Sequence, residues 1–217
     1  MMPDQTFKSP IYSYGLNSFN NLCFGNMSGG APYSAAIREH TIEAANVHFE
    51  KFPQTTAAPT AIISIPRGGV PTALAMHEAF AKASSQPLDI IHSQVKTHPD
   101  RLLGYADLNG YKQLIIVDGI IGTGSTIVNH MKAIPDNWKG IVQVFANAAA
   151  ALGLKKIQEH AETMDNPVHI AVGKVFPDEE CEWVNCDGKQ VYFVGYNSAK
   201  QIDYKLPDFG DHINLQP

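Results

Sequence analysis

The chain has 217 residues, of which 44% are hydrophobic and 17% charged, and its formal net charge at pH 7 is -5. This length and composition predict one large globular domain and exclude disordered and fibrous proteins. The negative charge excludes the basic surface that supplies non-specific nucleic-acid binding. We therefore expect no nucleic-acid partner, and any phosphate site must be built locally from backbone groups.

Targeting and metal-binding signals are weak along the chain. Residues 1–10 lack the apolar centre of a signal peptide and no run approaches 18 apolar residues, so we expect a cytoplasmic protein with no membrane partner. Cys181 and Cys186 are separated by four residues, but a zinc site would need two further ligands. The nearest candidates, His160 and His169, belong to no recognisable ligand pair, so we expect reduced, structural thiols.

Residues 1–33 are rich in Asn, Gly, Ser, Pro and Tyr without a lasting period, so we expect an extended N-terminal arm or cap. One domain then occupies residues 34–217, where segments with helical spacing alternate with short β-branched apolar runs. A Pro- and Thr-rich linker is expected at 53–60 and a mobile loop or hairpin at 97–112. Helices are predicted at 34–52, 70–83, 125–133 and 149–162, and strands at 61–65, 88–95, 114–117, 143–147, 169–175 and 190–196.

Strands that alternate with helices indicate βαβ units. They predict an α/β fold with a mostly parallel sheet and helices on both faces. Ligands of such folds bind at the carboxyl ends of the strands, so the turns after strands 61–65 and 114–117 should face a shared crevice. The histidines on the predicted helices, His40, His48 and His130, are expected at solvent-facing or core-edge positions rather than in catalysis.

The most informative segment is the Gly-rich turn that follows strand 114–117 and Asp118. Its small residues clear side chains away, so backbone N–H groups, hydroxyls and the following helix N-terminus can surround a phosphate. An ordinary strand-to-helix turn would use its glycines only for their dihedral angles. A Walker A loop would need a lysine where Ser125 stands, and a dinucleotide fingerprint would need its first glycine directly after the strand.

This segment resembles the phosphoribosyl pyrophosphate (PRPP) signature of type I phosphoribosyltransferases, most closely that of uracil phosphoribosyltransferases, in which a single acid follows the strand. The resemblance implies that Asp118 is a catalytic residue that holds the ribose hydroxyls of PRPP. Ser125 stands in place of a glycine of the family, which requires ordinary dihedral angles at this serine. The residues implied to hold the 5′-phosphate are Gly122, Thr123, Gly124, Ser125 and Thr126.

Two further segments resemble the same family, in the expected order along the chain. Pro66-Arg67-Gly68-Gly69 resembles its pyrophosphate loop, which implies that Arg67 is catalytic and supports a leaving group whose charge grows as the bond breaks. A surface arginine at an ordinary turn is the alternative. Residues 204–211 resemble its base-recognition loop, with an unstructured acidic tail as the alternative. The implied pyrophosphate residues are Arg67, Gly68, Gly69, Lys96 and Arg101, and the implied base-binding residues are Leu206, Pro207, Gly210 and Asp211.

The departures from the family lie in the loops around the pyrophosphate and the base. Ser93-Gln94 stands near the position of a family arginine, and Lys96 and Arg101 could supply the missing positive charge. Lys205 and Asp208 replace an apolar residue and a glycine of the base loop. The base can therefore differ from uracil.

Taken as a whole, the resemblance implies a glycosyltransferase that joins PRPP to a nucleobase, a pyrimidine such as uracil, giving a nucleoside 5′-monophosphate and pyrophosphate. It implies Mg²⁺ held mainly by PRPP, with no protein ligands assigned, and a homodimer. Two alternatives keep the same fold. One is a catalytically inactive sensor or accessory protein that binds PRPP or a nucleotide, which ligand binding without pyrophosphate release would identify. The other is a transferase for another base, which base competition would identify.

Overall fold

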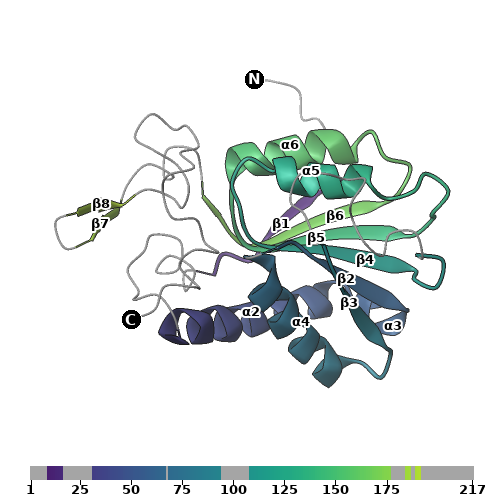
Figure 1. Ribbon diagram of the computed structural model, residues 1–217, viewed down its shortest axis with the longest axis horizontal. Helices are drawn as coiled ribbons and strands as arrows, with labels where there is room; N and C mark the ends of the chain where they lie inside the picture. Colours follow the sequence, from purple (N-terminus) through teal and green to yellow (C-terminus); the bar gives the residue numbers. More distant parts are fainter. Residues whose placement is uncertain are drawn as a thin grey trace.

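A parallel sheet with helices on both faces forms the body of the protein in the computed structural model (Figure 1). This confirms the α/β fold expected from the alternation of strands and helices. The structure describes residues 9–16, 31–66, 68–93 and 108–176, with the backbone alone at 31–33, and the backbone of 184–186 and 189–191.

The main sheet has six strands in the order β1-β6-β5-β4-β2-β3, and every neighbouring pair is parallel. β2 and β4, which precede the two turns of interest, are therefore hydrogen-bonded neighbours. A separate antiparallel pair is formed by β7 (Val184–Cys186) and β8 (Lys189–Val191). The strands of the main sheet are β1 (Ile11–Ser13), β2 (Thr60–Ser64), β3 (Leu88–His92), β4 (Gln113–Ile121), β5 (Ile141–Ala150) and β6 (Val168–Phe176).

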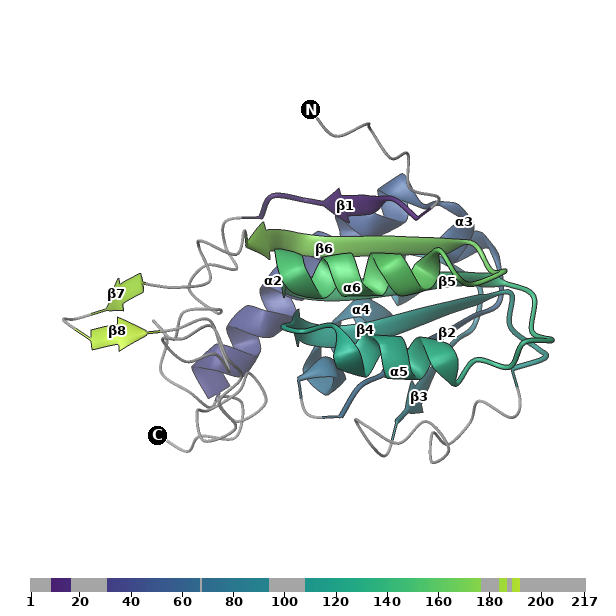
Figure 2. The same cartoon turned by 90° about the horizontal axis from the view of Figure 1, so that it is seen from above.

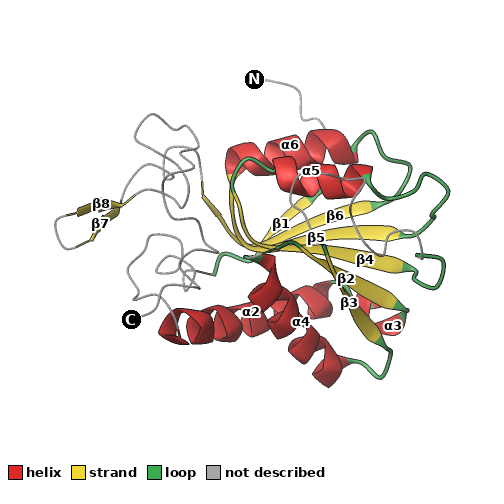
Figure 3. Ribbon diagram, viewed as in Figure 1, coloured by secondary structure: helices red, strands yellow, loops and turns green. Residues whose placement is uncertain are grey.

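Two pairs of long helices cover the sheet. α5 and α6 lie on one face, whereas α2 and α4 lie on the other (Figures 2 and 3). A one-turn helix, α3, connects α2 to β2. The helices are α2 (Ala31–Lys51), α3 (Gln54–Ala57), α4 (Gly69–Ala83), α5 (Ser125–Lys132) and α6 (Ala151–Ala161).

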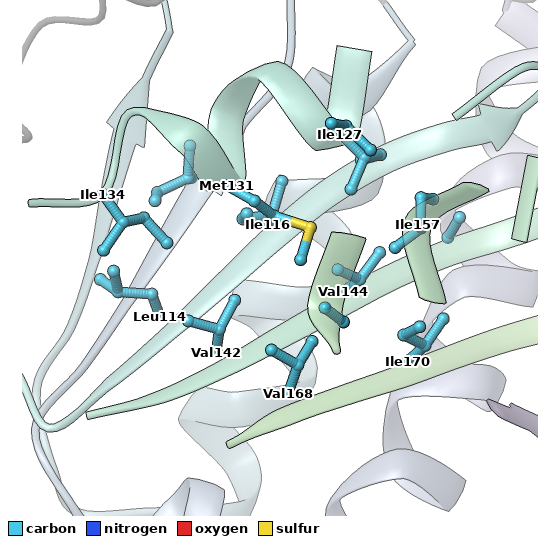
Figure 4. Close-up of a cluster of buried hydrophobic side chains, with 14 of the residues drawn as sticks. Leu114, Ile116, Ile127, Met131, Ile134, Val142, Val144, Ile157, Val168 and Ile170 are labelled. Carbon is cyan, nitrogen blue, oxygen red and sulfur yellow. The ribbon is translucent and has the colours of Figure 1, made fainter. Parts of the chain in front are cut away.

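Two hydrophobic cores follow from the alternation of side chains along buried strands. In β4, Leu114 and Ile116 pack into the core beneath α5 and α6, where Figure 4 shows Ile116 beside Met131 of α5 and Leu114 near Val142 of β5. Ile115, between them, belongs to the core on the α2 and α4 side. Burial on both faces explains why these strands read as continuous apolar runs in the sequence.

Several element boundaries differ from the sequence expectations. α2 begins at Ala31, three residues before the predicted start at residue 34. Pro32 is compatible with this start, because the first turn of a helix has no use for the missing N–H group. The predicted linker 53–60 contains α3, whose turn is closed by the N–H of Thr55 on the carbonyl oxygen of Phe52 at 2.9 Å. β3 ends at His92 rather than residue 95.

β4 continues past Asp118 to Ile121, so the prediction that the strand ends at Asp118 was wrong. The alternation of faces changes along this extension. Ile121 packs into the same core as Leu114 and Ile116, although strict alternation would place it on the opposite face. The alternation of faces changes at the same level in β5, where two consecutive residues face the α2 and α4 side. Asn147 is hydrogen-bonded to Thr41 of α2, and Ala148 belongs to the core on that side. The long parallel ladder explains the extension, because β4 and β5 pair through Ile121 and Ala149.

Residues 11–13, within the segment expected to be an arm, form edge strand β1. β1 pairs in parallel with β6, with Ile11 opposite Ile170. Its continuation stays beside β6, since the N–H of Tyr14 donates to the carbonyl oxygen of Val172 at 3.0 Å.

A buried polar network lies near the amino ends of β4 and β5, away from the Gly-rich turns. His48 of α2 is fully buried, contrary to the solvent-facing or core-edge position expected from sequence. Its Nε2 donates to the side-chain oxygen of Gln143 at 2.6 Å, and its Nδ1 accepts from the hydroxyl of Tyr14 at 2.8 Å. The Gln143 amide nitrogen then donates to Thr55 and Gln113, both at 2.8 Å. Burial lowers the pKa of His48 to about 4.

Candidate functional site

The turn after β2 lies against β4 toward the carboxyl edge of the sheet. Gly69, the first residue of α4, is packed so closely that a methyl carbon there would lie 2.5 Å from the carbonyl oxygen of Val117. The same carbon would lie 3.4 Å from the Cα atom of Asp118. Only a glycine allows this approach, so the turn that carries Gly68 and Gly69 lies directly against Val117 and Asp118 of β4. The structure thus brings these two glycines and Asp118 together.

Asp118 lies in β4 opposite Ala146 of β5 and is half-buried. Its Oδ1 accepts a hydrogen bond of 2.7 Å from the backbone N–H of Gly119. This bond fixes the carboxylate at the point where the strand begins to change its alternation. Its carboxylate is therefore a hydrogen-bond acceptor of fixed orientation. Three residues separate Asp118 from Gly122, where the Gly-rich turn begins.

The Gly-rich turn leads directly into α5. Gly124 is the N-cap residue, and its φ of +72° and ψ of -4° place it in the left-handed region that favours glycine. No side chain caps the helix, and its first turn contains no acidic residue. The N–H groups of the first helical turn have no partners within the helix, so they remain available to an anion. The turn has the geometry of an anion-binding helix N-terminus.

Ser125 is the first residue of α5, so its backbone is helical and its φ is negative. The serine therefore meets the condition set by the sequence analysis. Its Oγ accepts hydrogen bonds from the hydroxyl of Thr123 at 3.3 Å and from Nζ of Lys156 at 2.7 Å. Lys156 belongs to α6 and was not expected at this turn, because only the packing of α6 brings it there.

α6 is held against the turn through glycines on both sides. A methyl carbon at Gly153 would come closer than 3.0 Å to the carbonyl oxygen of Gly122, a distance that real methyl carbons essentially never show. A methyl carbon at Gly124 would also come closer than 3.0 Å to the carbonyl oxygen of Gly153. The turn and α6 therefore touch through backbone atoms, which ties the shape of the turn to the position of the helix.

A chain of buried hydrogen bonds supports the turn that carries Gly68. The hydroxyl of Thr72 in α4 donates to the carbonyl oxygen of Gly68 at 3.3 Å. The Asn147 amide of β5 donates to the Thr72 hydroxyl at 3.2 Å, and its oxygen accepts from the hydroxyl of Thr41 in α2 at 2.9 Å. Asn147 thus connects three elements beneath this turn. A lone Asn in an apolar strand was the only sequence signal for it.

His130 of α5 is hydrogen-bonded to Ser93, the residue that precedes the segment 94–107. Its Nδ1 donates to the carbonyl oxygen of Thr126 at 2.7 Å, so the neutral ring accepts at Nε2 from the hydroxyl of Ser93 at 2.9 Å. Burial lowers the pKa of His130, which keeps the ring neutral. The residue is buried, contrary to the expected solvent-facing or core-edge position. At the other end of the segment, Trp138 donates to the carbonyl oxygen of Leu108 at 3.1 Å.

The remaining predicted site residues lie outside the described part of the chain, so their roles stay predictions. They come from all three loops of the sequence analysis. They are Arg67, Lys96, Arg101, Leu206, Pro207, Gly210 and Asp211.

The side chains of the described residues include no group of three or more His, Cys, Asp or Glu residues that could hold a metal ion. None of the described helices is long and apolar enough to cross a membrane.

Comparison with known proteins places the chain among phosphoribosyltransferases. The family model for uracil phosphoribosyltransferase matches residues 31–178, more than half of the chain. A search of curated protein sequences found no match. Among solved structures, the AQ2163 protein from Aquifex aeolicus is similar over 94% of this chain and 97% of its own, with 16% identity and a TM-score of 0.63. Orotate phosphoribosyltransferase from Aeropyrum pernix matches over 66% of this chain and 71% of its own, with 14% identity and a TM-score of 0.43.

Proposed function

Because the chain belongs to the uracil phosphoribosyltransferase family, we propose that it transfers the phosphoribosyl group of PRPP to a nucleobase, a pyrimidine such as uracil. The products are a nucleoside 5′-monophosphate and pyrophosphate. The observation that carries this proposal is the uncapped N-terminus of α5, which the chain enters through Gly124. Asp118 lies in β4, the strand that leads into this turn. An anion site and a carboxylate in this order suit a phosphorylated sugar.

In the proposed reaction, a ring nitrogen of the base forms a bond to C1 of the ribose while the bond from C1 to the pyrophosphate oxygen breaks. The base loses its N–H proton, and the pyrophosphate leaves with the electron pair of the broken bond. The transition state resembles an oxocarbenium ion. The protein forms no covalent bond, so its contribution is to position the two substrates and stabilise the separating charges.

The two ends of PRPP are assigned to the two turns. Gly122, Gly124 and the first turn of α5 hold the 5′-phosphate through backbone N–H groups, with the hydroxyls of Thr123, Ser125 and Thr126. Asp118 accepts hydrogen bonds from the ribose hydroxyls. The fixed distance between these groups and the turn at Gly68 and Gly69 sets where the scissile bond lies.

Pyrophosphate is assigned to Arg67, Gly68 and Gly69, with Lys96 and Arg101 adding positive charge from the following loop. Asp118 is the one carboxylate within the two turns, residues 66–69 and 118–126. This donor set fits Mg²⁺ that is held mainly by the oxygens of PRPP, since Mg²⁺ usually binds through one or two carboxylates and substrate phosphates. When bound, Mg²⁺ would neutralise charge that develops on the departing pyrophosphate.

The base is assigned to the loop that contains Leu206, Pro207, Gly210 and Asp211. Backbone groups of such a loop can reject a wrong base, because that base leaves buried polar groups unpaired. Lys205 and Asp208 depart from the family pattern in this loop. The test below therefore also includes a PRPP- or nucleotide-binding protein without catalysis and a transferase for another base. We also propose a cytoplasmic location and a domain over residues 34–217, to which β1 adds an edge strand. The homodimer is proposed on the family resemblance alone.

The test is pyrophosphate release by the purified protein with PRPP and Mg²⁺, first with uracil and then with other bases. The variant Asp118→Asn should lose about 10- to 100-fold in rate, since a hydrogen bond to a charged group contributes about 1.5–3 kcal/mol. Its amide oxygen can still accept from the Gly119 N–H, so the fold is kept. The exposed Asp136→Asn serves as the matched control.

Release with uracil that falls about 10- to 100-fold in Asp118→Asn and is unchanged in Asp136→Asn would support the proposed reaction. Release with a different base alone would replace uracil and keep the transferase. If no base gives release while PRPP still raises the melting temperature, the transferase is wrong and the protein is a PRPP-binding sensor or accessory protein.

A further inference from the structure

We propose that Lys156 binds the 5′-phosphate of PRPP and that Ser125 joins the lysine to this site as a polarised donor. The inference deepens the proposed function and rests on it. Neither the sequence pattern nor the family assignment includes this lysine. It comes from α6, outside the Gly-rich turn, and reaches the turn only through the packing of the two helices.

The position of Lys156 is fixed by the face of α6 that meets the turn. Gly153 lies against the carbonyl oxygen of Gly122, and Ile157 would lie 3.0 Å from a methyl carbon at Gly124. Residues three and four apart share one face of a helix, so both Lys156 and Ile157 lie within one turn of Gly153 on the side of α6 that meets the Gly-rich turn. The backbone contact at Gly153 therefore holds the base of the lysine side chain at the turn.

The hydrogen bonds of Ser125 point to an anionic ligand. Lys156 has no acceptor group, so its Nζ donates to Ser125 at 2.7 Å and occupies one lone pair of the hydroxyl. The hydroxyl keeps its own proton, for which Thr123 at 3.3 Å is a distant partner. Ser125 can therefore donate that proton to an acceptor beside the uncapped N–H groups of α5.

Charge supports the same ligand. The segment from Gly122 to Thr126 contains no charged side chain of its own. Lys156 forms no ion pair with a described carboxylate, and its side chain is exposed. A phosphate at the turn would come within reach of the ammonium group and could take one of its hydrogen bonds in addition to that of Ser125. Lys156 then supplies the positive charge that the turn lacks.

Neighbouring Lys155 provides the matched control. It is exposed in the same helix but lies one residue earlier, where the helix turns it away from the face that Gly153 and Ile157 define. Both lysines give the same change in net charge when replaced by methionine. Any difference between the two variants therefore reports on position rather than on the overall field.

The experiment measures dissociation constants by calorimetry for PRPP with Mg²⁺ and, separately, for pyrophosphate with Mg²⁺. Lys156→Met should weaken PRPP binding about fivefold, as expected for a partly solvated ion pair, and leave pyrophosphate binding unchanged. Lys156→Arg should restore PRPP binding to within about twofold, because it keeps the charge. Lys155→Met should match the unaltered protein for both ligands.

Equal PRPP affinities for Lys156→Met and Lys155→Met would overturn the role of Lys156 and leave the proposed function intact. Weaker pyrophosphate binding in Lys156→Met would also overturn it, because the lysine would then act on the other end of PRPP. If the unaltered protein binds no PRPP, the proposed function fails and this inference fails with it.

Discussion

The contact between Gly153 and Gly122 gives the sharpest prediction about how the fold shapes the site. In Gly153→Ala, the new methyl carbon would press on the carbonyl oxygen of Gly122, a backbone atom that no side-chain rotation can move away. Either α6 or the turn must shift by roughly 1 Å to restore an ordinary separation near 3.5 Å. In the proposed function, the Gly-rich turn is the part on which ligand binding depends. The matched control is Gly110→Ala, since nothing lies within 4 Å of a methyl carbon at Gly110.

Two opposing effects set the magnitude for Gly153→Ala. Overpacking a closely packed contact costs about 1–3 kcal/mol. Alanine gains up to about 1 kcal/mol over glycine within a helix, which offsets part of that cost. We expect a net loss of about 1 kcal/mol, which lowers the melting temperature by about 2–4 °C for a chain of this size. The effect on catalysis should be larger, because a misplacement of about 1 Å at a reacting group can cost about 100-fold in rate.

The assay combines thermal unfolding with PRPP affinity and pyrophosphate release for both variants. Gly153→Ala should lose at least about tenfold in PRPP affinity or turnover, a loss out of proportion to its loss of stability. Gly110→Ala should keep the affinity and the melting temperature of the unaltered protein. A Gly153→Ala protein with unchanged PRPP affinity and turnover would refute the argument that this backbone contact sets the shape of the turn.

Three other predictions concern the remaining contacts. Asn147→Ala leaves the hydroxyls of Thr41 and Thr72 without their partner, so it should cost about 1–3 kcal/mol in denaturant unfolding. It should also weaken pyrophosphate binding, whereas unchanged binding would show that the support of Gly68 is structural only. Ser125→Ala should weaken PRPP binding about tenfold, and an effect on pyrophosphate binding instead would contradict the assignment of the two turns. The pKa of His48 is about 4 when folded and 6.5 in its ordinary range, so His48 contributes stability that is complete above pH 6.5 and is lost as the pH falls to about 4. The loss should reach about 3 kcal/mol in urea titrations, and His48→Gln, which does not titrate, should show a smaller decline.

The fold was predictable because its signals are local. Isoleucine-rich runs such as residues 61–65 and 114–117 lie in strands buried on both faces, and composition alone marks such segments. The order of strands and helices then restricted the topology to parallel βαβ units. The far ends of the strands were less predictable. The stretch 145–150 is dominated by small apolar residues, so no period in the sequence indicates where its alternation changes face.

The arrangement of residues at the candidate site was predictable only where one segment carries both ends of a contact. Asp118 and the turn that follows it are close in sequence, and the glycines there are required by the backbone itself. Lys156 and Asn147 act across elements that are joined only by tertiary packing, so no spacing rule could identify them. The buried positions of His48 and His130 were missed for the same reason. Each ring meets partners from a different element.

The polar network at the amino end of the sheet and the start of α5 at its carboxyl end have different consequences for stability and for binding. At the amino end, both nitrogens of His48 are hydrogen-bonded and Gln143 continues the network to Thr55. At the carboxyl end, α5 begins without a side-chain cap, and the hydroxyl of Ser125 beside it accepts from Lys156 and keeps its own proton. Polar groups left without partners cost stability unless water or a ligand meets them. Acid should therefore weaken the fold through the amino end, whereas PRPP should stabilise it from the carboxyl end by mass action. If the stabilisation by PRPP depends on Lys156 and the loss at low pH depends on His48, the double variant should show the sum of the two effects.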